Sequence, residues 1–157
     1  TTMLARESLA IGEAVGDAIA RARGMDARAR DFRTFDTICS ATQERQDAVT
    51  QLLEERLDAM VVIGGFNSSN TISLAALCAE RVPTYHVESP EGIDADAGTI
   101  HYRLPGSRHV ESEARDWLPP GEIALGITAG ASTPNSKIGE AVVRILATRG
   151  LELPALD

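Results

Sequence analysis

Residues 59–70 read AMVVIGGFNSSN, and this stretch decides how we expect the chain to fold. Its first five residues are apolar, as in a buried strand. Gly64 and Gly65 then favour a turn, and the small polar residues at positions 67–70 are typical of the start of a helix. The stretch therefore predicts a buried strand, a tight turn and a helix, which together form the repeating element of an α/β fold.

The polar residues at positions 67–70, Asn-Ser-Ser-Asn, combine hydroxyl and amide groups with the free backbone N–H groups of a helix start. The helix dipole adds a partial positive charge at the same point, so the segment suits an anion such as a phosphate group. Ser and Asn are also common helix caps, and taken alone these residues fit a capping role better than a ligand site. Both interpretations stay open at this point.

Outward from this stretch, the apolar periodicity alternates between strand and helix patterns. Strands that alternate with helices imply parallel pairing, so the predicted fold class is α/β, with a small parallel sheet flanked by helices. Residues 28–33 are expected to be a charged connector, and residues 89–121 mainly a long loop with a short strand at 100–102. We expect helices at residues 4–23, 43–57, about 70–80 and 136–148, and strands at residues 34–39, 59–63, 84–87 and 122–127.

Three of the expected strands end in polar loops. In a parallel sheet, ligands bind outside the carboxyl ends of the strands, so these loops should lie along one edge. Their convergence favours a shared site for an anion and a metal. The first loop delivers Cys39 and Thr42, the second Ser68, Ser69 and Asn70, and the third covers residues 128–134, in which Ser132 can cap the next helix.

The two cysteines differ in their setting, and no disulfide framework is expected. Cys78 falls on the helix face that should be buried, so we expect it in the core. Cys39 comes just before an amphipathic helix, where a thiolate has a lowered pKa and suits metal ligation or nucleophilic attack. The three histidines, His86, His101 and His109, are expected at the surface or in loops.

Composition limits the classes of partner. The chain has 157 residues, 43% of them hydrophobic, and a net charge of −8. The charge argues against nucleic acid and against a membrane surface as partners, but leaves room for a small anion held by local donors. No apolar run approaches the roughly 20 residues that a membrane span needs. The sequence begins Thr-Thr-Met, so we expect it to be a piece of a longer protein.

Four segments resemble motifs of one enzyme family. Residues 37–48 (TICSATQERQDA) resemble the third cysteine motif of 4-hydroxy-3-methylbut-2-enyl diphosphate reductase. Residues 64–71 (GGFNSSNT) and 127–134 (ITAGASTP) resemble its two diphosphate-binding motifs, and residues 1–4 (TTML) resemble a further substrate-contacting segment. Residues 89–121 are similar to the plant and cyanobacterial branch. The motif order and spacing agree along nearly the whole chain, which is therefore similar to the C-terminal portion of the family.

The resemblance implies the reductive removal of a hydroxyl group from an allylic diphosphate. The products would be isopentenyl and dimethylallyl diphosphate, in the methylerythritol phosphate route to isoprenoids. It also implies a [4Fe-4S] cluster held by three cysteines, with Cys39 as one ligand and one iron open to the substrate, and ferredoxin or flavodoxin as electron donor. Carried over residue by residue, the substrate contacts are Thr2, Ser68, Ser69, Asn70 and Ser132.

Several functional residues of the family match nothing in this chain. The resemblance places two further cluster cysteines, the diphosphate-binding histidines and the proton-delivering glutamate in an N-terminal part of the same protein. We therefore assign no catalytic residue here and expect the chain alone to be inactive. The implied architecture is a trefoil-like reductase of three similar α/β units. Residues 1–33 would then close the preceding unit, 34–150 would form the last unit and 151–157 a tail.

A second class of function stays open. The same loops could serve a non-catalytic module that binds a phosphorylated metabolite, with Cys39 as a buried or redox-sensing thiol. A P-loop nucleotide enzyme is a poorer choice, because residues 64–71 lack the lysine that a Walker motif requires. The expected location is a bacterial cytoplasm, with the plastid stroma as the alternative.

Overall fold

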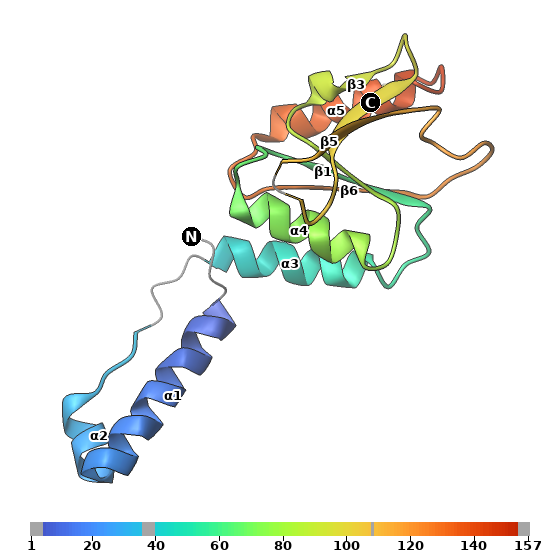
Figure 1. Cartoon of the computed structure of the whole chain (residues 1–157). Helices are drawn as coiled ribbons and strands as arrows, with labels where there is room; N and C mark the ends of the chain where they lie inside the picture. Colours follow the sequence, from blue (N-terminus) through green and yellow to red (C-terminus); the bar gives the residue numbers. More distant parts are fainter. Residues whose placement is uncertain (1–4, 36–39, 108, 154–157) are drawn as a thin grey trace. The chain divides into compact units, whose positions relative to one another are not determined.

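A computed structural model describes residues 5–35, 40–107 and 109–153. The chain divides into two compact units, Thr1–Glu44 and Arg45–Asp157, whose elements are labelled in Figure 1. The division that the sequence suggested after residue 33 stays a prediction. Within the described ranges, no helix is both long enough and apolar enough to cross a membrane.

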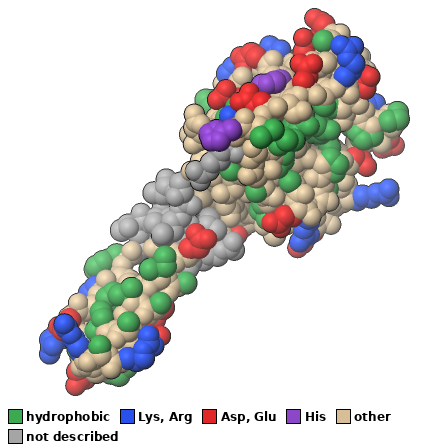
Figure 2. Space-filling model, viewed as in Figure 1, with side chains coloured by type: hydrophobic (Ala, Val, Ile, Leu, Met, Phe, Trp, Pro, Cys, Tyr) green, Lys and Arg blue, Asp and Glu red, His purple; other side chains and the backbone are tan. Residues whose placement is uncertain are grey.

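The first unit holds helices α1 (Ala5–Arg23) and α2 (Met25–Asp31). The helix expected at 4–23 is confirmed, but the connector expected at 28–33 is helical as far as Asp31. Arg28 in this segment forms ion pairs with α1. Its guanidinium lies 2.5 Å from the Glu13 carboxylate and 2.6 Å from the Asp17 carboxylate. In Figure 2 hydrophobic side chains gather on the surface of this unit, and the exposed ones are Leu9, Ile11, Val15, Met25 and Phe35.

Three parallel strands form the centre of the second unit. Strand β1 (Ala59–Ile63) lies between β2 (Thr84–Val87) and β6 (Leu125–Ala129). The strands expected at 59–63 and 84–87 are confirmed, and the last strand lies slightly later than the expected 122–127. Helix α4 (Ser69–Ala79) connects β1 to β2, which accounts for the parallel pairing of these two strands.

The long loop expected at residues 89–121 is wrong, because this region extends the sheet with antiparallel strands. After a short 3-10 helix, η1 (Pro90–Gly92), come β3 (Ile93–Asp94), β4 (Thr99–Arg103) and β5 (Glu111–Arg115). The described strands pair in the order β3-β4-β2-β1-β6, with β5 also paired to β4. The sheet is therefore mixed, and the expected short strand at 100–102 is the centre of β4.

Helices cover both faces of the sheet, which confirms the α/β fold class (Figure 1). Helix α5 (Asn135–Ala147) packs on the face that receives Val61 and Ile63 of β1. Helices α3 (Ser40–Leu52) and α4 (Ser69–Ala79) pack on the opposite face, which receives the alternate β1 side chains. Because strand side chains alternate, every residue of β1 is buried.

Cys78 lies in the core between α4 and the sheet, as expected, and its side chain is fully buried. On α3 the buried residues are Thr42 and Val49, whereas Ala48, expected on the inner face, is exposed. The strand expected at 34–39 is not found at Thr34 and Phe35, and residues 36–39 lie outside the described part of the chain.

Candidate anion-binding site

The parallel strands end level with one another, so the loops that follow them meet at one edge of the sheet. Ile63, the last residue of β1, is in register with Val87 and with Ala129. The backbone continues this pairing past the strands. The Gly64 N–H donates to the Val87 carbonyl, and the Gly130 N–H donates to the Ile63 carbonyl, both at 2.9 Å. This edge carries the polar segments that the sequence singled out.

Two glycines let helix α4 approach the strand ends closely. Gly64 has a φ of +146°, and a Cβ atom built there would lie 2.8 Å from the Thr133 hydroxyl and 2.9 Å from that of Thr71. A Cβ atom at Gly130 would overlap the Thr71 hydroxyl. Neither position has room for a side chain. The start of α4 therefore packs directly against the loops that follow β1 and β6.

The segment at residues 67–70 does cap a helix, as one of its two interpretations required. Ser68 is the N-cap of α4, and its hydroxyl accepts a hydrogen bond from the Thr71 N–H at 3.3 Å. Within the described chain, the N–H groups of Ser69 and Asn70 have no acceptor, as expected in a first helical turn. The Ser69 side chain is exposed and that of Ser68 is half-buried, so an anion could reach both.

Asn70 supplies the observation that a capping role does not explain. Its side chain is only 9% exposed, and its Oδ1 accepts a hydrogen bond of 3.1 Å from the Ala131 N–H. This bond fixes the orientation of the amide, because the flipped form would oppose two donors. The Nδ2 group is then a buried donor without a partner among the described residues. Such a group costs about 1–3 kcal/mol unless an acceptor satisfies it.

The loop after β6 faces the same edge. The Thr133 N–H donates to the Gly130 carbonyl at 2.9 Å, and the Thr133 hydroxyl donates to the Ile63 carbonyl at 3.1 Å. Ser132, in the turn so formed, is exposed. It does not cap α5, because the N-cap residue is Pro134. The structure thus brings Ser132 to the strand edge where Ser68, Ser69 and Asn70 lie.

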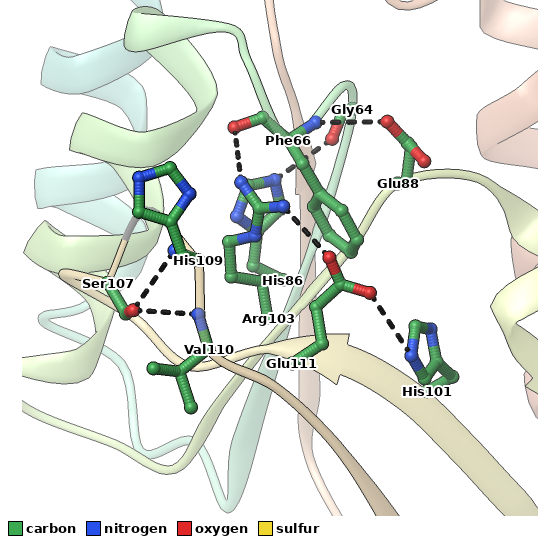
Figure 3. A network of polar contacts seen from close by, with 10 residues as sticks. All are labelled: Gly64, Phe66, His86, Glu88, His101, Arg103, Ser107, His109, Val110 and Glu111. Atoms are coloured by element: carbon green, nitrogen blue, oxygen red, sulfur yellow. Dashed lines mark hydrogen bonds and ion pairs between the residues drawn. The ribbon is translucent and has the colours of Figure 1, made fainter.

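A buried arginine holds the loop between β1 and α4. Arg103, the last residue of β4, is 7% exposed and donates to the Phe66 carbonyl at 2.9 Å (Figure 3). Its guanidinium also lies 4.2 Å from the centre of the Phe66 ring and bonds the Glu111 carboxylate at 2.9 Å. The second oxygen of Glu111 lies 3.4 Å from Nε2 of His101. Nothing in the sequence pattern marked Arg103 as part of the site, because the region was taken for a loop.

His86 holds the same loop from β2. The expectation of a surface histidine is wrong here, because His86 is 1% exposed and its Nε2 lies 2.9 Å from the Gly64 carbonyl (Figure 3). The carbonyl can only accept, so Nε2 carries the proton. Burial is the main cause that lowers the pKa of His86, with Arg103 adding to it. His86 lies within the strand expected at 84–87, between Tyr85 and Val87, which pack in the core. This position was the available signal for its burial. His101 and His109 are exposed, as expected.

The metal end of the expected site lies outside what the structure describes. Cys39 and Thr2 fall in the undescribed ranges. Among the described residues there is no group of three His, Cys, Asp or Glu side chains that could hold a metal ion. Cys78 does not fit an iron–sulfur cluster either, because burial raises the pKa of its thiol to about 11 and a cluster binds the thiolate.

Known proteins of one family match nearly the whole chain. The sequence model of the family described as LytB protein matches residues 1–146. The chain is 41% identical over 152 residues to the 4-hydroxy-3-methylbut-2-enyl diphosphate reductase of Gloeobacter violaceus, which covers 96% of the chain and 36% of that protein. It is 43% identical to the enzyme of that name from Cyanothece sp., over 99% of the chain and 38% of the relative. The chain thus spans just over a third of the length of the curated relatives it matches.

Proposed function

The chain belongs to the LytB protein family, and on that premise we propose that it is the diphosphate-binding part of a 4-hydroxy-3-methylbut-2-enyl diphosphate reductase. The complete reaction would reduce the substrate with two electrons and two protons, replace its hydroxyl group by hydrogen and release water. The products would be isopentenyl and dimethylallyl diphosphate, in the methylerythritol phosphate route. The proposal concerns the longer protein, of which this chain would be a C-terminal part that is inactive alone.

The chain's own contribution is to hold the diphosphate. Ser68, Ser69, Asn70 and Ser132 would surround it, with the N–H groups of the first turn of α4 as further donors. The unsatisfied Asn70 Nδ2 group carries this proposal, because a phosphate oxygen would supply the acceptor that it lacks. Neutral donors held in place before the ligand arrives stabilise an anion with little reorganisation. Thr2 is proposed to contact the substrate at its hydroxyl end.

We propose that Cys39 gives one thiolate to a [4Fe-4S] cluster. The other two cysteine ligands and the proton-delivering glutamate would come from the N-terminal part of the protein. Such a cluster supplies electrons and an open iron that acts as a Lewis acid. Ferredoxin or flavodoxin would reduce it. The division into residues 1–33, 34–150 and 151–157, the trefoil-like arrangement of three units, and a bacterial cytoplasm or plastid stroma as location are parts of the same proposal.

One observation favours a second candidate, a non-catalytic module that binds a phosphorylated metabolite. The residues proposed to hold the diphosphate all lie between Ser68 and Ser132, and the hydrogen bond from the Ala131 N–H to Asn70 joins their two loops directly. Anion binding could therefore persist without a cluster. The coding sequence upstream of Thr1 separates the two candidates: two further cysteines with a histidine and glutamate set there support the reductase.

The test uses the protein that this longer coding sequence specifies. Purified without oxygen and reconstituted with iron and sulfide, it should show the visible absorption of an iron–sulfur cluster and reduce the allylic diphosphate. Cys39→Ser should abolish the absorption, whereas Cys78→Ala, the matched control in the core, should retain it. Ser132→Ala should keep the cluster and weaken diphosphate binding. A cluster that survives Cys39→Ser would disprove the ligand assignment.

A further inference from the structure

Two backbone carbonyl groups in the turn between β1 and α4 are bound by side chains from two other strands. The Gly64 carbonyl lies 2.9 Å from His86 Nε2 on β2, and the Phe66 carbonyl accepts from Arg103 on β4 at 2.9 Å. A hydrogen bond from the Ser68 N–H to the Gly65 carbonyl, at 2.9 Å, closes the turn itself. The path of the chain into α4 is thus fixed by groups that do not belong to α4.

The Phe66 side chain also contacts residues of the other strands. Its ring packs edge-on against the His86 ring at 5.0 Å between centroids, and the Arg103 guanidinium lies over it at 4.2 Å. Its N–H group donates to the Glu88 carboxylate at 3.4 Å. Phe66 is 5% exposed, so these contacts are largely shielded from water. In Figure 3 the side chains of Phe66, His86 and Arg103 form one packed group.

Arg103 itself is tied to the antiparallel part of the sheet. Its second guanidinium nitrogen bonds Glu111 on β5, and Arg103 and Glu111 are paired in the register of β4 and β5. A guanidinium can serve both partners at once because its donors form a rigid fork. A lysine could reach one of them but would lack that fork. Through Arg103, hydrogen bonds therefore connect the β4–β5 hairpin to the turn that precedes α4.

We propose that Arg103 and His86 are positioning residues for the diphosphate site, and that the β4–β5 hairpin serves to brace that site. They touch no ligand. They hold residues 64–67 so that the N–H groups of Ser69 and Asn70 and the Asn70 amide converge on one anion. This inference rests on the proposed diphosphate site, and it assigns a role to a segment that the sequence alone suggested was a loop.

The experiment measures the binding of inorganic pyrophosphate to the 157-residue chain by titration calorimetry. Arg103→Gln removes the fork, and Arg103→Lys keeps its charge. The matched control is Arg144→Gln, because Arg144 likewise donates to a backbone carbonyl, that of Ile93 at 3.2 Å, and bonds a glutamate. We expect Arg103→Gln to weaken pyrophosphate binding about tenfold. Arg103→Lys should restore less than half of the binding free energy that Arg103→Gln loses. Arg144→Gln should change the affinity by less than about twofold.

Hydrogen exchange separates positioning from general destabilisation. Peptides that cover residues 64–70 should exchange faster in Arg103→Gln than in Arg144→Gln. The two variants are compared at the same free energy of unfolding, set from their urea midpoints. Should Arg103→Gln fail to fold, Glu111→Gln replaces it, with an expected weakening of about threefold because Arg103 keeps its Phe66 bond. Equal affinity in the wild type and these variants would overturn the positioning role alone. No binding by the wild type would overturn the diphosphate site and the inference together.

Discussion

Asn70→Asp should separate the two functions of the α4 start, helix capping and anion binding. The new carboxylate keeps an oxygen where Oδ1 accepts the Ala131 N–H at 3.1 Å, so the link to the loop after β6 survives. It replaces the unsatisfied Nδ2 donor by an acceptor, which removes a buried orphan group. It also places a negative charge in the first turn of a helix, which stabilises by about 0.3–1 kcal/mol.

Desolvation nearly cancels the two gains in folding stability, while the two costs to binding add. Desolvation of a carboxylate at a position only 9% exposed opposes the gains, so we expect the free energy of unfolding to change by less than about 1 kcal/mol. Loss of the donor costs about 1–3 kcal/mol of binding. Repulsion between unit charges about 5 Å apart adds about 3 kcal/mol at an effective dielectric constant of 20. Together these costs are about 4–6 kcal/mol, which predicts a loss of pyrophosphate affinity of at least about a thousandfold.

The assay pairs titration calorimetry with urea unfolding of the same samples. Gln51→Glu, on the exposed side of α3, is the control for the change in net charge and should bind as the wild type does. Asn70→Ala, which removes the donor without adding charge, should lose about tenfold. If Asn70→Asp binds pyrophosphate within threefold of the wild type, the anion does not meet Nδ2 and the reasoning fails.

Four further predictions concern other groups. Gly130→Ala should destabilise the chain by about 1–3 kcal/mol in urea unfolding, because its Cβ overlaps the Thr71 hydroxyl. Gly139→Ala, in open space on α5, should stabilise it by about 0.5–1 kcal/mol. Equal effects of the two substitutions would contradict the packing at Gly130. Cys78, whose pKa is raised to about 11, should stay unmodified by iodoacetamide at pH 8 until the protein unfolds, as mass spectrometry can check. The pKa of Glu91, lowered to about 2 chiefly by the Lys137 ammonium and then by Ser89, should rise in Lys137→Gln when followed by NMR, and an unchanged value would exclude that pairing. Because burial lowers the pKa of His86 below its ordinary value of 6.5, the unfolded chain binds the proton first; stability should therefore hold above pH 6.5 and fall as the pH drops below it, less steeply in His86→Phe.

The parallel centre of the fold was predictable because its signals are local. Residues 59–63 and 84–87 are short apolar or alternating runs bounded by turn residues, and the structure has strands with those bounds. The antiparallel extension was not predictable in the same way. Strand β5 has no buried residue and carries mostly charged side chains, so its sequence lacks the apolar alternation of a core strand. Its pairing with β4 depends on tertiary contacts.

The candidate site divides in the same manner. Ser68, Ser69, Asn70 and Ser132 could be chosen from motif and strand order, because parallel strands deliver their loops to one edge. The burial of Asn70 and its bond to Ala131 could not, since they depend on how closely Gly130 lets the loop approach α4. Arg103 was missed because a buried charge is recognisable only once its partners are known, whereas the position of His86 in an expected strand was a signal that went unused.

The most direct test of the diphosphate site is an NMR titration of the ¹⁵N-labelled chain with inorganic pyrophosphate. The account predicts saturable shifts at the backbone amides of Ser69 and Asn70, at the Asn70 side-chain amide, and at Ala131 and Ser132. Shifts confined to the arginine-rich helix α2, or no saturable change at the start of α4, would contradict it.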